Sequence, residues 1–136
     1  MLVRRLLSGF FALVAVVAIG LSGCTPGNSA NGITGNYQTD TLALVDSLRT
    51  AINLPEGGPE KRAAEADARA KINAFASRYR RDTRVAGLSS YTTMRTALNA
   101  LAGHYSAYPN RPVPEKLKKR LDQEFRQVEA ALNRGA

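Results

Sequence analysis

The chain has 136 residues, of which 19 are basic and 11 acidic, giving a formal net charge of +8. This length suits a single domain, and a content of 44% hydrophobic and 22% charged residues is typical of globular rather than disordered proteins. With a single cysteine, the chain cannot form an intramolecular disulfide. One cysteine and one histidine also cannot supply the ligands of most zinc sites. These counts argue against a metal site and against an enzyme.

The first 23 residues have the pattern of a lipoprotein signal peptide. Arg4 and Arg5 form a basic start, and an apolar stretch follows that is short for a membrane-spanning helix. The run Leu21-Ser22-Gly23-Cys24 then resembles a bacterial lipobox. We therefore predict cleavage after residue 23 and attachment of acyl chains such as palmitate at Cys24, which would hold the protein on a membrane surface. An uncleaved anchor with an incidental cysteine is the alternative.

Residues 24–36 are rich in glycine, asparagine and proline, so we predict a flexible tether there. Over residues 37–136, apolar side chains recur at helical spacing in four stripes. The stripes are Tyr37, Thr41, Leu44, Leu48 and Ile52; Ala68, Ile72, Phe75 and Tyr79; Tyr91, Met94, Leu98, Leu101, Tyr105 and Tyr108; and Leu117, Leu121, Phe125, Val128 and Leu132. No segment alternates with period two. The pattern predicts an all-α, up-down-up-down four-helix bundle over residues 37–136.

Capping and helix-breaking residues mark the expected ends of these helices. Asn36 is a candidate N-cap for the first helix, and Pro59 suits the first turn of the second. We expect Ser89 or Ser90 to cap the third helix. Prolines at 109, 112 and 114 separate the third helix from the fourth, and Gly135 closes the fourth.

The positive charge is concentrated in the middle of the chain. Removal of residues 1–23 takes away two arginines and no acid, leaving 113 residues with a net charge of +6. Residues 78–114 carry +5 of this charge, because Asp82 is their only acid. Their six cations, which we interpret as candidate partner-binding residues, are Arg78, Arg80, Arg81, Arg84, Arg95 and Arg111. Arginine is enriched in protein interfaces, where its planar fork binds carboxylates in pairs of hydrogen bonds.

The predicted third helix has no carboxylate, and its face away from the apolar stripe carries small or uncharged side chains. These are Thr92, Thr96, Asn99, Ala100 and Gly103. Such a face favours a protein-docking surface, since the centres of interfaces are depleted of charge. The alternative is that another part of the same chain covers it.

A second basic run, Lys116 to Arg120, lies in the predicted fourth helix. We expect acids four residues away to neutralise it, leaving a solvated helix face. The expected pairs are Glu115–Lys119, Lys118–Asp122, Arg120–Glu124 and Asp122–Arg126.

Nucleic-acid binding and catalysis are weaker interpretations of the same residues. The tyrosines fall on core stripes, so no basic groove with exposed aromatic residues is visible. A nucleophile and a base could be assembled on paper from Ser89 or Ser90 and His104. The sequence around them, however, has no nucleophile elbow and no phosphate loop. We expect His104 to make a local hydrogen bond or to lie at the surface. The sequence thus predicts a non-catalytic protein with no cofactor, no metal and no nucleic-acid partner.

Several distinctive runs are spread over the chain. They are Thr34-Gly35-Asn36-Tyr37, Arg78-Tyr79-Arg80-Arg81-Asp82, Gly87 to Met94, Ala102-Gly103-His104-Tyr105, Tyr108 to Pro112, and Pro114 to Leu121. Together with the lipobox, these runs resemble a known family, the small lumenal assembly and repair lipoproteins of cyanobacterial photosystem II. The resemblance covers about residues 33–134.

The resemblance implies a monomeric four-helix bundle, anchored by lipid on the lumenal side of the thylakoid membrane. It implies transient binding to immature photosystem II, chiefly to the smaller chlorophyll-binding core-antenna protein, before the manganese cluster and extrinsic subunits are in place. The alternative is a general envelope lipoprotein that binds a polyanion, an anionic lipid or another membrane protein.

Overall fold

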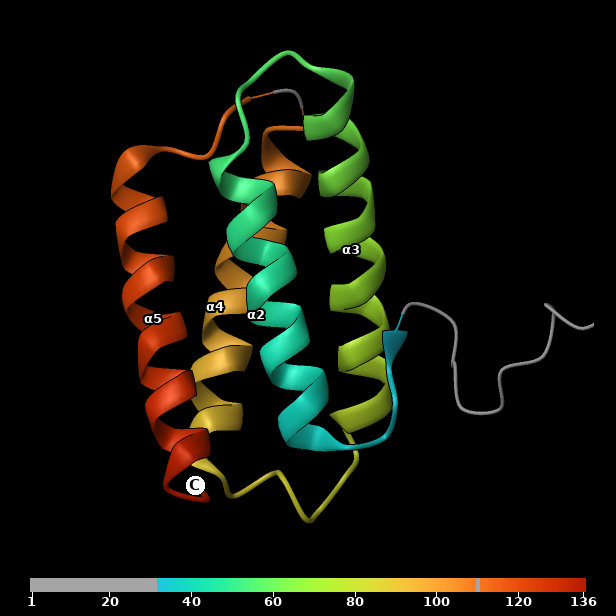
Figure 1. Ribbon diagram of the computed structural model, residues 1–136, viewed down its shortest axis with the longest axis vertical. Helices are drawn as coiled ribbons and strands as arrows, with labels where there is room; N and C mark the ends of the chain where they lie inside the picture. The colour runs from blue at the N-terminus through green and yellow to red at the C-terminus, as the bar shows by residue number, and fades with distance from the viewer. Residues whose placement is uncertain (1–31, 110) are drawn as a thin grey trace, which may run out of the picture.

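The computed structural model describes residues 32–109 and 111–136, and within them it contains four α-helices and no strand (Figure 1). The helices are α2 (Tyr37–Asn53), α3 (Pro59–Tyr79), α4 (Ser89–Ala107) and α5 (Glu115–Asn133). This confirms the predicted all-α bundle. The predicted signal peptide, Cys24 and residues 24–31 of the predicted tether lie outside the described residues.

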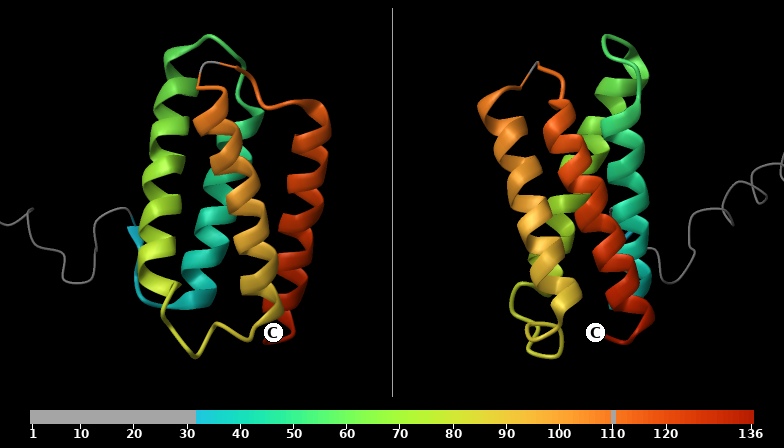
Figure 2. Two further views of the ribbon diagram at one scale, coloured as in Figure 1. Left: turned by 180° about the vertical axis from the view of Figure 1, so that it is seen from behind. Right: turned by 90° about the vertical axis from the view of Figure 1, so that its left-hand side faces the viewer.

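Successive helices run in opposite directions, which confirms the up-down-up-down topology (Figure 1). The closest packing is within two helical hairpins, α2 with α3 and α4 with α5. The hairpins meet along two further seams, α2 against α5 and α3 against α4, so the four helices enclose one core. Seen from behind, α3 and α4 lie side by side on the outside of the bundle (Figure 2, left).

The helix starts follow the predicted caps with one exception. The Asn36 side chain accepts a hydrogen bond from the Thr39 amide at 3.0 Å, and α3 begins at Pro59. The prediction that Ser89 or Ser90 caps α4 is wrong, because the capping position is Leu88, which gives no side-chain bond. Ser90 is instead the second residue of the helix and is buried, and its hydroxyl bonds that of Tyr37 at 2.8 Å.

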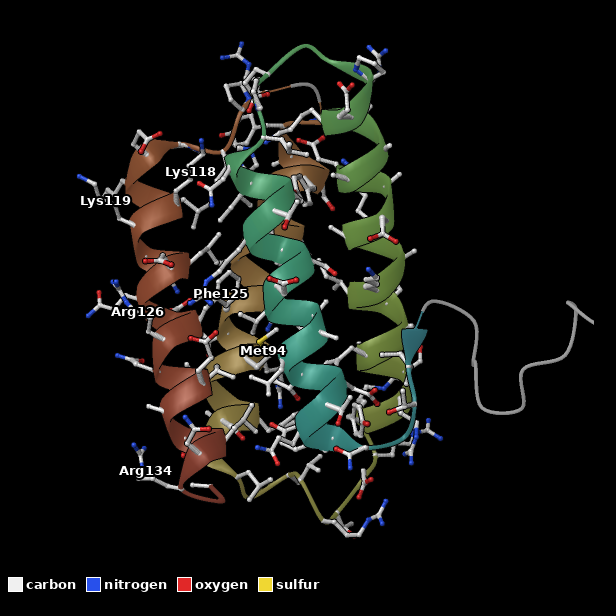
Figure 3. The ribbon with its side chains drawn as sticks, viewed as in Figure 1. Met94, Lys118, Lys119, Phe125, Arg126 and Arg134 are labelled. Atoms are coloured by element: carbon white, nitrogen blue, oxygen red, sulfur yellow. The ribbon has the colours of Figure 1, made fainter. Side chains whose placement is uncertain are left out.

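The predicted apolar stripes form the core, with one side chain misplaced. Phe125 and Met94 are fully buried and point between the helices (Figure 3). Tyr108 was expected in the core, but 53% of its surface is exposed. The reason is Pro109, which disfavours helical backbone in the preceding residue. The helix accordingly ends at Ala107, and Tyr108 leaves the line of the stripe.

Residues 32–36 lie against the bundle, so the expectation of a free tether does not hold for this part of residues 24–36. Ile33 packs against the core, and the Thr34 and Gly35 amides bond the carboxylate of Asp40 at 2.8 and 3.0 Å. The bundle therefore begins a few residues before its first helix.

Truncation of core residues tests this packing. Phe125→Ala and Leu98→Ala should each lower the free energy of unfolding by roughly 2–5 kcal/mol, because each leaves a cavity in a close-packed interior. Lys119→Ala should change it little, since Lys119 projects outward from α5 (Figure 3). Urea denaturation measures all three. A larger loss for Lys119→Ala than for the other two would contradict the helix phasing.

Candidate docking surface

The end of α3, where most of the candidate arginines lie, is fixed by a buried carboxylate. Asp40 in the first turn of α2 is 1% exposed. It accepts hydrogen bonds from the Tyr79 hydroxyl, the Thr34 hydroxyl (2.7 Å) and the amides of Thr34 and Gly35. We call these four residues the Asp40 clasp. It joins the incoming chain, the start of α2 and the end of α3.

The hydrogen bonds of the clasp outweigh the cost of burying its charge. Burial by itself would raise the pKa of Asp40, but the donors from Tyr79, Thr34 and Gly35 lower it below its ordinary value. The pKa of Tyr79 is raised by its own burial and by the bond to Asp40. Asp40 thus stays ionised while Tyr79 stays protonated, which keeps the bond charge-assisted over a wide pH range.

The structure separates the six candidate arginines into two groups. Arg78 lies in the last turn of α3, and Arg80, Arg81 and Arg84 follow in the loop to α4, so these four lie at one end of the bundle. Arg95 is on α4, about 9 Å along the axis from its first residue. Arg111 lies beyond the other end of α4, in the connection to α5. Of the six, Arg80 and Arg95 line one groove between α3 and α4, and Arg111 lies at the other end of the bundle.

Asp82 neutralises part of this group. Its carboxylate takes two hydrogen bonds from the Arg84 side chain, at 2.8 and 3.1 Å, and lies 3.6 Å from Arg78. The bonds from Arg84 and the two positive charges lower the pKa of Asp82 to about 2. Arg78 also stacks over the Tyr79 ring at 5.1 Å. Arg80, Arg81 and Arg95 have no carboxylate within ion-pair distance among the residues that the structure describes.

The outer face of α4 is open to solvent, as the docking interpretation requires. Thr92, Thr96, Asn99 and Gly103 are exposed, and Ala100 is half-buried. The Thr96 hydroxyl bonds the Thr92 carbonyl of the same helix at 3.1 Å, so it needs no outside partner. Arg95, which is exposed on this face, is its only charged side chain.

A groove runs along the seam between α3 and α4 beside this face. Its volume is about 260 Å³. It is lined by Ile72, Phe75, Ala76, Arg80, Tyr91, Arg95, Leu98, Asn99 and Ala102. A second hollow continues it past Arg95 toward the loop and is lined by Ala86, Tyr91, Thr92, Arg95, Thr96 and Asn99. The sequence predicted Arg95 and the uncharged face of α4, but it gave no sign of the groove, which needs the two helices side by side.

The basic run of α5 is only partly neutralised, because Lys116 and Lys119 form no ion pair among the described residues and the predicted Lys118–Asp122 pair does not form. Arg120 bonds Glu124 at 3.1 Å and Arg126 approaches Asp122 at 3.3 Å, as predicted. Glu115 pairs with Lys118 at 3.5 Å rather than with Lys119. From α2, Arg49 bonds Glu129 and approaches Asp122 at 3.4 Å, which the sequence did not reveal.

The other candidate chemistry is not assembled. His104 is buried, and its Nε2 bonds the Arg111 carbonyl at 3.2 Å, which confirms the local hydrogen bond. Ser89 and His104 lie about 22 Å apart along α4 and cannot act together. The described residues contain no group of three or more His, Cys, Asp or Glu side chains placed to hold a metal. None of the described helices is long and apolar enough to cross a membrane.

A family model described as Photosystem II Pbs27 matches residues 5–132 of the chain. The chain belongs to the Psb27 family. The photosystem II assembly factor lipoprotein Psb27 of Thermosynechococcus vestitus is 59% identical over 125 residues, which are 92% of each chain. The chloroplastic photosystem II repair protein PSB27-H1 of Arabidopsis thaliana is 33% identical over 100 residues, 73% of this chain and 58% of that one.

The fold is shared as well. The solution structure of Psb27 from cyanobacterial photosystem II matches this one with a TM-score of 0.74 at 49% identity, covering 85% of this chain and all of that one. The family resemblance predicted from the sequence is thereby confirmed. The names of the two relatives describe assembly and repair, and neither name is that of an enzyme.

The Asp40 clasp gives a pH-dependent prediction. Tyr79→Phe removes one donor from a buried carboxylate and should cost about 1–3 kcal/mol at pH 7. Because the folded pKa of Asp40 is lowered, its contribution is complete above its ordinary value of 3.8 and is lost as the pH falls through the folded value. The variant has therefore already lost part of this contribution at pH 7, and it should lose less than the parent as the pH falls, so that the stability gap between the two narrows toward pH 2. Urea denaturation between pH 7 and pH 2 measures this gap.

Tyr91→Phe is the matched control for this experiment. It removes a hydroxyl from the same aromatic cluster, from a ring 6.5 Å from that of Tyr37, without touching Asp40. The role of the clasp would be contradicted if the two variants lost the same free energy of unfolding at pH 7. It would also be contradicted if the free energy of unfolding of Tyr79→Phe changed with pH in the same way as that of the parent.

Proposed function

We propose that this chain is a non-catalytic assembly and repair factor of photosystem II, anchored by lipid at the lumenal side of the thylakoid membrane. The family, and the assembly and repair roles in the names of its relatives, support the photosystem as the partner. The observation that carries a docking role is the exposed, uncharged face of α4 beside arginines that have no carboxylate partner within the described part of the chain.

In this proposal the protein docks as a monomer on the lumenal loops of the smaller chlorophyll-binding core-antenna protein. It does so before the manganese cluster and the extrinsic subunits are in place, and it leaves afterwards. Carboxylates of those loops would pair with Arg80, Arg81 and Arg95, which keep their charge free for a partner. Arg78 and Arg84 share Asp82 and contribute less, and Arg111 lies too far away to join the same contact.

Lipid attachment at Cys24 would keep the docking surface close to the membrane. Seven residues lie between Cys24 and Gly32, where the described chain begins, and the eight steps from one to the other span at most about 29 Å. Residues 33–35 are bound to the bundle, so the anchor has little further slack. The protein would thereby be confined to a thin layer above the membrane. This confinement raises its effective concentration for a partner in the same membrane.

Replacing the cysteine tests the anchor. Cys24→Ala removes the thiol that would carry the lipid, so the protein should appear in the soluble lumenal fraction or remain as an uncleaved precursor. Fractionation and mass spectrometry of the mature amino terminus distinguish these outcomes. An unmodified Cys24 in membrane-bound parent protein would overturn the proposed attachment.

Charge reversal tests the docking surface. The double variant Arg81→Glu and Arg95→Glu should weaken capture of the photosystem II intermediate from solubilised thylakoids at least tenfold. The physical reason is that leaving one partner of a desolvated charge pair unmatched costs about 2–5 kcal/mol. Circular dichroism should show an unchanged bundle, because both side chains are exposed.

Lys116→Glu with Lys119→Glu is the control pair, since both lysines are exposed on α5 and the net charge changes equally. If only the control pair abolished capture, the interface would lie on α5 and not on the surface proposed here. Equal loss with both pairs would indicate binding to a polyanion through net charge, the alternative that the sequence left open.

A further inference from the structure

We infer that the groove between α3 and α4 receives a short segment of the partner protein, in which an apolar side chain enters the groove and an adjacent carboxylate pairs with Arg80 and Arg95. This inference rests on the proposed docking function and specifies the chemistry of the contact. It commits to a protein segment as the occupant, for the reasons of shape and charge that follow.

The floor of the groove is the place where the core reaches the surface. Ile72, Tyr91 and Leu98 retain 6–7% of their surface exposed, whereas Phe75 beneath them retains 1%. An apolar side chain placed there would bury these remaining surfaces together with its own, which is favourable in proportion to the area removed from water. A volume of about 260 Å³ lies just under the range of roughly 300–1,000 Å³ typical of small-molecule sites. The space suits one or two side chains.

The charged side chains that line the groove are all positive. Arg80 stands on the α3 side and Arg95 on the α4 side, and no acidic residue lines the groove or the hollow that continues it. Two guanidinium groups with no internal carboxylate repel each other and remain available for bidentate bonds. A partner segment that brings Asp or Glu next to its apolar residue therefore complements the groove in both charge and polarity. A purely apolar occupant would leave both arginines without a carboxylate partner.

The groove exists because both helices present small side chains at this seam. Ala76 of α3 and Ala102 of α4 line it, where larger residues would fill the space. The helix pairs α2–α3 and α4–α5 pack more closely than α3 packs on α4. The seam faces the viewer in Figure 2 (left), and no described segment of the chain crosses it there.

Filling the groove while keeping both arginines is the first test. Ala76→Leu places a larger side chain over the opening, and because Ala76 is exposed the core should stay intact. Capture of the photosystem II intermediate from solubilised thylakoids should fall more than tenfold with an unchanged melting temperature. Ala66→Leu is the matched control, because Ala66 is exposed on the same helix away from the groove. Equal capture by the parent and Ala76→Leu would overturn the inference.

Photo-crosslinking tests the same contact from the wall of the groove. A benzoyl-phenylalanine at Asn99 on the groove wall should crosslink to a partner peptide that carries Asp or Glu within two residues of an apolar side chain, identified by mass spectrometry. The same probe at Gln127, exposed on α5, should not crosslink to that peptide. A crosslinked peptide without a carboxylate, or a lipid adduct at Asn99, would overturn the inference.

The two tests separate this inference from the proposed function. If the parent captures the intermediate but both groove experiments give the opposing result, docking stands and the groove is not its site. If the parent captures no photosystem II component at all, the proposed function itself fails and the groove inference fails with it.

Discussion

The bundle depends on one buried charge, the carboxylate of Asp40. A lone carboxylate at 1% exposure would be strongly destabilising, and this one is stable only because donors from two other parts of the chain reach it. The start of α2, the end of α3 and residues 34–35 must therefore come together for any of them to be satisfied. That requirement sets the position of Tyr79, and through it the position of the arginines on either side.

The rest of that end of the bundle is built on the clasp. Tyr37, Phe75, Tyr79 and Tyr91 form a cluster of aromatic rings with centroids 5.0–6.5 Å apart. The hydrogen bond between the hydroxyls of Tyr37 and Ser90 links the start of α2 to the start of α4. Because these polar bonds and the tilted and edge-on ring contacts hold three helices at this end, the seam between α3 and α4 can stay open without loss of the fold.

Internal ion pairs decide which of the many cations remain available. Asp82 occupies Arg84 and Arg78, and Arg49 draws Glu129 and Asp122 of α5 toward α2. Surface pairs of this kind add little to stability, but they determine the local sign of the surface. Of the cations that form no ion pair among the described residues, Arg80 and Arg95 line one groove beside an uncharged helix face. That arrangement is a more selective docking feature than the net charge of the chain.

The sequence alone determined the helices, most of the core and the family. Helical periodicity states which residues share a face of their own helix, and the prolines and Asn36 mark where helices begin and end. The placement of Tyr108 failed because the effect of Pro109 on the preceding backbone outweighed a regular stripe. The assignment of Ser89 or Ser90 as a cap failed because a partner 53 residues away, Tyr37, claims the Ser90 hydroxyl.

Only the tertiary structure decided which helix faces which. Periodicity carries no information about partners distant in the chain, so it could not show that Tyr79 bonds Asp40 or that Arg49 bonds Glu129. For the same reason, six arginines close in sequence looked like one group. The length of α4 places Arg111 at the opposite end from Arg81. The groove is likewise a property of two helices packed side by side, with small residues of each meeting at one seam.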